Sequence, residues 1–115
     1  MKAVELLRTI NPATEEVLNQ YQIMTKEEIN SATKKAQTQH REWKKDSHKR
    51  IDLLHDFAQE LRKNKENLAK TATNEMGKTI KEARSEVEKC AWAVDYYADN
   101  GQNLLTSNLL GSMIN

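Results

Sequence analysis

The stretch NEMGKTIKEARSEVEKCAWAVDYYADNG, residues 74–101, decides how the rest of this chain is arranged. Gly77 is suited to end a helix, because a residue without a Cβ takes the left-handed backbone conformation at little steric cost. Thr79 and Glu82 then fit a capping box, in which two side chains satisfy free backbone N–H groups at a helix start. One helix is therefore predicted to end at Gly77, and a second to begin immediately afterwards.

This second helix is predicted to be about seven turns long and to fray around Asn100 and Gly101. Its apolar residues recur at seven-residue intervals and form one stripe, against which other elements must pack. We expect Tyr97 to face this core, and Trp92 and Tyr96, four residues apart, to meet on an adjoining strip. The stripe consists of Ile80, Ala83, Val87, Cys90, Val94 and Tyr97.

Two segments near the N-terminus are the only plausible strands, VELLRTI at 4–10 and EVLNQYQI at 16–23. Asn11 and Pro12 between them have turn chemistry, because Asn bonds to its own backbone and Pro presets φ. The two segments therefore predict a β-hairpin.

Three further helices are predicted between the hairpin and the long helix. Thr25 and Glu28 fit a second capping box, and Asp46 with the following serine breaks the helix that this box opens. The next helix runs from about 48 to 63, and a short one then reaches Gly77. The helix that begins after Thr25 carries Ile29, Ala32, Ala36 and Trp43 on one side.

The predicted fold class is mainly α with an N-terminal β-hairpin, an α+β arrangement with about four helices. The chain is read as one partial domain, with the hairpin at 4–23, a helical region at 25–105 and an irregular tail at 106–115.

Composition excludes several classes of function. With 18 basic and 17 acidic residues, the net charge of +1 gives no general attraction to nucleic acid or to anionic membranes. We expect no membrane span, because no run of about 18 apolar residues is present. The single cysteine excludes an internal disulfide and suits a reducing compartment, so a cytoplasmic protein is expected.

Several motifs carry a family resemblance. EMGK at 75–78, EARSEVEKCA at 82–91 and YYA at 96–98 resemble the N-terminal region of NAD(P)-dependent aldehyde dehydrogenases. The segment INPAT at 10–14 is similar to the INPATGE opening of that family, and Trp43 stands where a helix of the family ends in Trp. The resemblance covers residues 8 to 105, is greatest to the succinate-semialdehyde dehydrogenases, and implies the N-terminal piece of their α/β fold.

The chain departs from the family in two places. Glu15 stands where the family usually has Gly; if a positive φ is needed there, Glu costs about 1 kcal/mol, which favours a reshaped turn. Beyond Leu105, the tail TSNLLGSMIN lacks the family's next charged strand and its PWNFP segment. A truncated or frameshifted reading frame explains this ending better than a cloning boundary does.

The resemblance implies aldehyde oxidation, with NAD or NADP as cofactor in the complete enzyme. That chemistry needs a nucleophilic Cys, a general-base Glu and a cofactor site, and none of the three maps onto this chain. Gly77, Gly101 and Gly111 are too far apart to cradle a pyrophosphate. We therefore assign no catalytic, cofactor-binding or metal residue and expect this chain alone to bind no cofactor.

Cys90 is the only thiol, and two roles are open to it. It is either a nucleophile or a small core residue on the apolar stripe. The surrounding EKCAWA does not match the family's nucleophile segment, and a buried thiol is a poor nucleophile, so the structural role is favoured.

Three histidines invite a metal interpretation. His48 and His55 are seven residues apart, however, whereas a two-His helical zinc pair needs four-residue spacing and a third ligand. Solvated histidines on a polar face are the favoured interpretation for these two and for His40.

A basic run and an aromatic group complete the candidates. The run from Arg41 to Arg50 is diluted by acidic residues and contains one aromatic, which favours a solvated helix junction over a nucleic-acid site. By resemblance only, Tyr96 or Asp99 borders the substrate tunnel of a complete enzyme, although core or interface packing is favoured.

Two hypotheses follow. In the favoured one, the chain is the N-terminal segment of an enzyme that oxidises succinate semialdehyde with NAD(P)+; alone it is inactive, and its exposed apolar stripe packs against the remainder of the enzyme or self-associates. In the alternative, it is a stand-alone small helical protein-interaction module.

Overall fold

The computed structural model describes residues 4–106 of the chain. The strands are β1 (Leu6–Ile10) and β2 (Val17–Gln22), and they precede four helices. The helices are α1 (Lys26–Trp43), α2 (Ser47–Lys63), α3 (Lys65–Met76) and α4 (Ile80–Leu105). This order confirms the predicted fold class of an N-terminal hairpin followed by four helices.

β1 and β2 form a two-stranded antiparallel sheet with a register shift between Thr9 and Ile10. The turn between the strands is held by Asn11, whose Oδ1 accepts a hydrogen bond from the backbone N–H of Ala13 at 2.9 Å. Glu15 has φ +62° in this turn. The position therefore takes the left-handed conformation, which is the condition under which a steric cost was expected for Glu15.

The predicted helix ends are largely confirmed. Thr25 makes both halves of its capping box with Glu28, and the side chain of Asp46 caps α2. Gly77 ends α3 with φ +70°. At α4 only half of the predicted capping box forms. Thr79 Oγ1 accepts a hydrogen bond from the backbone N–H of Glu82. The Glu82 carboxylate accepts from the Thr79 hydroxyl instead of from the Thr79 backbone N–H.

Gly77 has a second reason to lack a side chain. A Cβ built there would lie 3.2 Å from Cγ of Pro12, because the hairpin turn lies against the end of α3. A larger residue would thus combine backbone strain with a close contact. The contact attaches the hairpin to the helical part of the chain.

α4 has 26 residues, which confirms the predicted length of about seven turns. It does not fray around Asn100 and Gly101, as was expected, but continues through Gly101 to Leu105. The side-chain amide of Asn100 donates to the carbonyl of Tyr96 at 2.9 Å, which satisfies one backbone group on the preceding turn. A single glycine inside a long helix lowers its stability without ending it.

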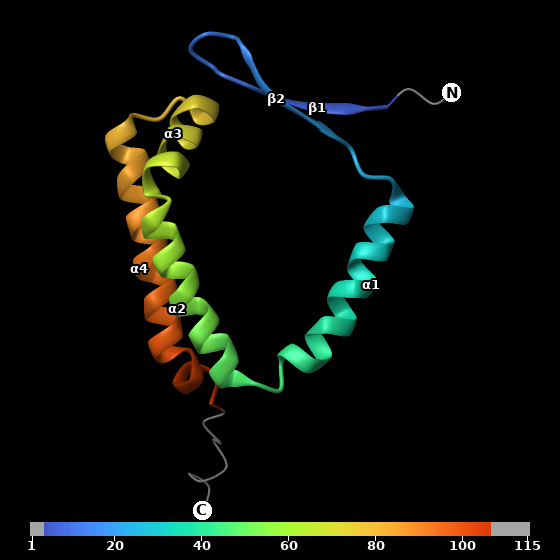
Figure 1. Cartoon of the computed structure of the whole chain (residues 1–115), viewed down its shortest axis with the longest axis vertical. Coiled ribbons are helices and arrows are strands. Elements are labelled where there is room, and N and C mark those ends of the chain that lie inside the picture. Colours follow the sequence, from blue (N-terminus) through green and yellow to red (C-terminus); the bar gives the residue numbers. More distant parts are fainter. Residues whose placement is uncertain (1–3, 107–115) are drawn as a thin grey trace, which may run out of the picture.

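Two long helices, α2 and α4, lie side by side, and α3 packs on the N-terminal part of α4 (Figure 1). The fully buried hydrophobic residues of the described chain are all alanines, which allow a close approach of the helices. They are Ala58, Ala69, Ala83, Ala91 and Ala98.

The predicted stripe on α4 is therefore only partly correct. Ala83 is buried, but Cys90 and Tyr97 are exposed, and their neighbours Ala91 and Ala98 take the buried positions. A strict seven-residue repeat drifts by about 20° per heptad around a straight α-helix. The small side chains of Ala91 and Ala98 let α2 approach α4 closely at these positions. The larger side chains of Cys90 and Tyr97 then lie at the edge of the contact between the two helices.

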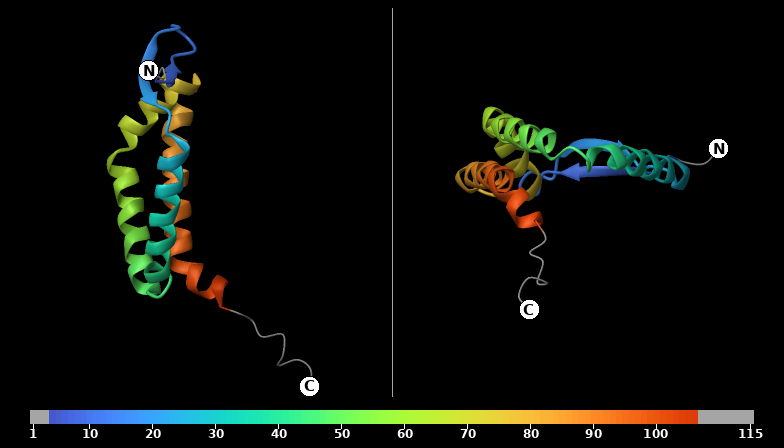
Figure 2. Two further views of the ribbon diagram at one scale, coloured as in Figure 1. Left: turned by 90° about the vertical axis from the view of Figure 1, so that its right-hand side faces the viewer. Right: turned by 90° about the horizontal axis from the view of Figure 1, so that it is seen from below.

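The molecule has an open shape. Its radius of gyration is 20.2 Å, where a compact chain of this length has about 13 Å. α1 stands apart from α2 and α4 (Figures 1 and 2). The hairpin lies at the end of the molecule opposite the junction between α1 and α2. No residue of α1 is buried, so its predicted apolar side is uncovered.

Within residues 4–106, no helix is both long and apolar enough to cross a membrane.

Candidate functional site

α4 carries most of the residues that could perform a function, on three separate surfaces. A charged cluster joins α4 to α2 and α3, an aromatic cluster lies on its outer side, and a polar depression surrounds its first turns.

The charged cluster is built on Arg62 of α2. Its Nη1 lies 2.8 Å from Oδ2 of Asp95, and its Nε lies 3.1 Å from Oε1 of Glu88. Glu88 also pairs with Lys65 of α3, at 3.6 Å. His55 of α2 completes the cluster by contacting both Asp95 and Asp99.

These contacts bias the charges of the cluster. Hydrogen bonds from Arg62, and then from His55, hold the pKa of Asp95 below its ordinary range, against partial desolvation. Bonds to Asp95 and Glu88 raise the pKa of Arg62. Asp95 is thus a carboxylate at neutral pH.

A second ion pair links α3 to α4. Arg84 donates to both carboxylate oxygens of Glu66, Nε at 2.9 Å and Nη2 at 3.0 Å. This bidentate contact lowers the pKa of Glu66 and raises that of Arg84. This ion pair holds α3 against α4. Because both side chains are engaged in it, neither is available to act on a substrate.

The charged cluster was not predicted from the sequence, although the spacing of its residues indicates it. His55 and Arg62 are seven residues apart on α2, and Glu88 and Asp95 are seven apart on α4. Opposite charges at equal spacing on two helices indicate paired faces. His55 was predicted to be a solvated histidine; it is instead a partly buried contact between the two helices.

The aromatic cluster consists of Trp92, Tyr96 and Tyr97. The ring centroids of Trp92 and Tyr96 are 6.4 Å apart, which confirms that these two residues meet. Tyr96 and Tyr97 pack edge to face with centroids 5.4 Å apart. All three are exposed, Trp92 by 64% and Tyr97 by 58%, so the prediction that Tyr97 faces the core is wrong.

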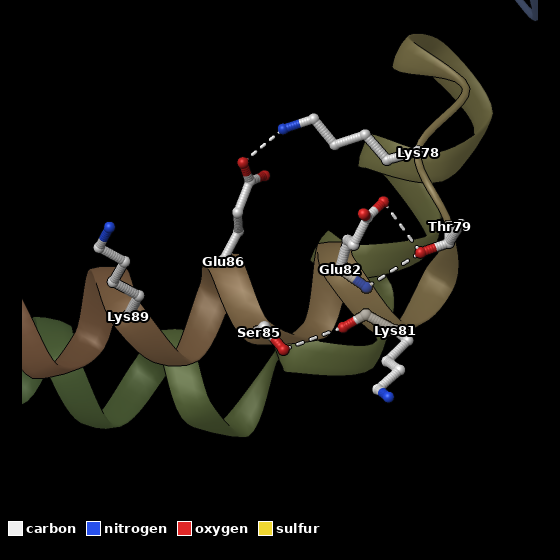
Figure 3. A pocket seen from close by; sticks show the side chains of 7 residues that line it. All are labelled: Lys78, Thr79, Lys81, Glu82, Ser85, Glu86 and Lys89. Atoms are coloured by element: carbon white, nitrogen blue, oxygen red, sulfur yellow. Dashed lines mark hydrogen bonds and ion pairs between the residues drawn. The ribbon is translucent and has the colours of Figure 1, made fainter.

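An open polar depression lies at the start of α4 (Figure 3). Lys78 reaches the carboxylate of Glu86, and the hydroxyl of Ser85 donates to the carbonyl of Lys81 at 3.1 Å. Three lysines and two glutamates line it, so its charges largely offset one another and it has no strong preference for an anion or a cation. Its lining is Lys78, Thr79, Lys81, Glu82, Ser85, Glu86 and Lys89.

Cys90 does not occupy the core position predicted for it. It is exposed on α4, next to the buried Ala91. Exposure removes the argument that burial makes the thiol unreactive.

The remaining candidates give no reaction centre. Among the described residues, no group of three or more His, Cys, Asp and Glu side chains is arranged to hold a metal ion. His40 and His48 are exposed, and in the basic run Arg50 donates to the carbonyl of Trp43 at 2.8 Å. This run therefore contributes to the α1–α2 junction.

A dinucleotide site does not fit the glycines that the structure describes. Gly77 ends α3 against Pro12, and Gly101 lies inside α4, whereas a pyrophosphate needs several close glycines between a strand and a helix. Gly111 lies outside the described residues. No step of a cofactor-dependent reaction is assigned to these residues.

Comparison with known sequences decides the family. The profile described as the aldehyde dehydrogenase family matches residues 2–112. The chain belongs to the aldehyde dehydrogenase family. It corresponds to the N-terminal segment of these enzymes, as the resemblance implied.

Two relatives illustrate the relationship. A succinate semialdehyde dehydrogenase [NAD(P)+] of Escherichia coli (strain K12) is 37% identical over 98 residues, covering 84% of this chain and 21% of the relative. A malonate-semialdehyde dehydrogenase of Bacillus subtilis (strain 168) is 38% identical over 105 residues, covering 90% of this chain and 21% of the relative. The chain thus spans about a fifth of the length of these aldehyde dehydrogenases.

The fold agrees with a solved aldehyde dehydrogenase. The crystal structure of succinic semialdehyde dehydrogenase from Streptococcus pyogenes with NADP+ matches at TM-score 0.80 and 36% identity. The match covers 86% of this chain and 22% of that chain. The open arrangement of hairpin and helices is therefore one that also occurs within a larger aldehyde dehydrogenase.

Proposed function

We propose that this chain is part of an NAD(P)-dependent aldehyde dehydrogenase that oxidises a semialdehyde, succinate semialdehyde in the first instance, to its acid. The observation that carries the proposal is the family match along residues 2–112, together with relatives that are named semialdehyde dehydrogenases. The relatives include enzymes of succinate and of malonate semialdehyde, so the succinate assignment rests on the first relative and on the solved structure.

The role proposed for this segment is structural: its uncovered apolar surfaces pack against the remainder of the aldehyde dehydrogenase fold. The support is that every helix exposes large apolar side chains, among them Ile29 on α1, Phe57 on α2 and Trp92 on α4. Such extended exposure marks a contact surface or an aggregation hazard in a free chain. Self-association through the same surfaces is the second outcome that we propose.

The isolated chain is proposed to be inactive and to reside in the cytoplasm. Among the contacts of residues 4–106, no general base is paired with Cys90, the only thiol of the chain, and neither Gly77 nor Gly101 fits a dinucleotide site. A single cysteine in a polar chain suits a reducing compartment.

The alternative, a stand-alone interaction module, has less support. A module that folds alone needs its own core, whereas the buried hydrophobic residues among residues 4–106 are five alanines and the radius of gyration is 20.2 Å.

Two assays test the proposal. NAD(P)H formation from succinate semialdehyde is measured first with the isolated chain, where we expect no rate above a no-protein control. The matching segment of the Escherichia coli relative is then replaced by this chain, with the same enzyme lacking the segment as control.

The exchanged enzyme is expected to be folded and active, and the shortened enzyme inactive. Activity of the isolated chain would contradict the proposed inactivity. A shortened enzyme as active as the exchanged one would contradict the structural role.

A further inference from the structure

A short connection, Lys44 to Asp46, joins α1 to α2, and the two helices diverge from it (Figure 1). No residue of α1 is buried, so side-chain packing contributes little to the position of this helix relative to α2. Among the hydrogen bonds and ion pairs of residues 4–106, one joins α1 directly to α2. In it, Nη1 of Arg50 donates to the backbone carbonyl of Trp43 at 2.8 Å.

The Trp43 carbonyl belongs to the last turn of α1, where carbonyl groups have no partner further along their own helix. The carbonyl of His40, one turn earlier, is still satisfied by the backbone N–H of Lys44 at 3.0 Å. Trp43 receives its donor from the next helix instead. A guanidinium suits this place because its charge meets the negative end of the α1 dipole, and an ionised donor makes a stronger hydrogen bond than a neutral one.

Arg50 stands at an electrostatically unfavourable place in its own helix. The first turn of α2 has no acidic residue, and His48, Lys49 and Arg50 follow one another there. Positive charge near the N-terminus of a helix opposes the helix dipole. A local conflict of this kind is expected where a contact outside the helix offsets it, and Arg50, which is half-buried, has that contact in α1.

We propose that Arg50 is a positioning residue, which fixes the angle between α1 and α2 and so holds α1 away from the α2–α4 pair. The start of α2 is fixed separately, because Oδ1 of Asp46 accepts from the backbone N–H of Lys49 at 2.9 Å. Arg50 then ties the end of α1 to this fixed first turn. The exposed apolar side of α1, which includes Ile29, remains uncovered as a result. This role concerns the chain by itself and does not depend on the proposed function.

Distances between pairs of spin labels in the full chain test the proposal. Cys90, the only thiol, is exposed on α4 and carries one label. Ala32→Cys on the exposed α1 carries the other. Labelled chains are diluted with unlabelled ones, so that only distances within one chain contribute. We expect a narrow distribution of distances with Arg50 present and the loss of this narrow distribution in Arg50→Gln.

Lys49→Gln is the matched control. It removes the same charge from the neighbouring residue, whose side chain is exposed, and should leave the distribution narrow. Equal widths in Lys49→Gln and Arg50→Gln, whether both narrow or both broad, would overturn the proposal. A broad distribution in the chain that retains Arg50 would overturn it as well.

Two further measurements separate loss of this contact from general misfolding. Labels at Cys90 and at Gln59→Cys, on the exposed side of α2, report the packing of α2 on α4 and should give the same distance in every variant. A changed distance in Arg50→Gln would assign the effect to loosened packing and contradict the proposal. Arg50→Lys keeps a cationic donor and should narrow the α1–α4 distribution again, at least in part. A width equal to that of Arg50→Gln would rule out the charged donor as the cause.

Discussion

Glu15 holds a left-handed backbone conformation, φ +62°, at a position where any residue with a Cβ pays a steric penalty. The turn keeps this conformation because Asn11 and the two paired strands around it determine the path of the chain. The backbone N–H of Glu15 donates to the carbonyl of Asn11 at 2.8 Å, which closes the turn in this shape.

Glu15→Gly is therefore expected to stabilise the hairpin by up to about 1 kcal/mol, since glycine adopts a positive φ freely. The gain is reduced by the greater freedom of glycine in the unfolded chain. Hydrogen exchange of the β1 and β2 amides measures the change. Glu16→Gly, one residue later, is the control and should weaken the same amides; equal effects of the two variants would rule out relief of strain.

Cys90 and Ala91 are adjacent residues with opposite environments, exposed and buried. We expect Cys90 to react with a thiol reagent in the native chain nearly as fast as in urea. Cys90→Ala should change the free energy of unfolding by no more than about 0.5 kcal/mol, as for other surface positions. In the double variant Cys90→Ala with Ala91→Cys, the displaced thiol should react far more slowly. Equal rates at both positions would show that α4 is not packed on α2 in solution.

At the scale of the elements, the contact of α4 with α2 and α3 depends on alanine. Helices approach closely only where side chains are small, and the buried positions on α4 are Ala83, Ala91 and Ala98. Ion pairs then border this contact, with Arg62 on one side and the Arg84–Glu66 pair near α3. Close packing and matched charge together fix which face of α4 is covered.

Ala91→Leu is expected to force α2 and α4 apart and to destabilise the chain by about 1–3 kcal/mol, the range for overpacked cores. Ala32→Leu on α1 makes the same chemical change at an exposed position and should be nearly neutral. Urea unfolding followed by circular dichroism compares the two. Equal destabilisation by both changes would mean that the alanine contact is not the core.

At the scale of the whole molecule, the exposed area exceeds what a closed fold allows. The accessible surface is 10144 Å², where a compact protein of this mass has about 6,500 Å². α1 stands apart from the α2–α4 pair (Figure 1), and none of its residues is buried. Residues 4–106 have secondary structure over most of their length, but few places where two layers meet.

In isolation we therefore expect strong helical circular dichroism together with binding of a hydrophobic dye, self-association, or both. Capping and helix propensity maintain the helices even where packing is thin. Calorimetry, dye fluorescence and light scattering on one sample measure these properties. A sharp thermal transition from a monodisperse monomer with little dye binding would favour the stand-alone module.

Sequence by itself determined the elements and the family. Capping side chains at Thr25 and Asp46, the glycine at 77 and the turn at Asn11 act within a few residues, so local chemistry is enough to predict them. The motifs around EMGK and INPAT likewise identified the aldehyde dehydrogenase family, which the family match confirms.

Only the tertiary structure decided which residues of α4 are covered. Periodicity allowed both Cys90 and Ala91 as core positions, because one residue turns the helix by about 100° and the stripe is about that wide. The choice depended on how closely α2 approaches, which is a property of two helices together. His55 gained its two carboxylate partners for the same reason: residues 40 and 44 positions away in the chain become neighbours only when α2 and α4 pack.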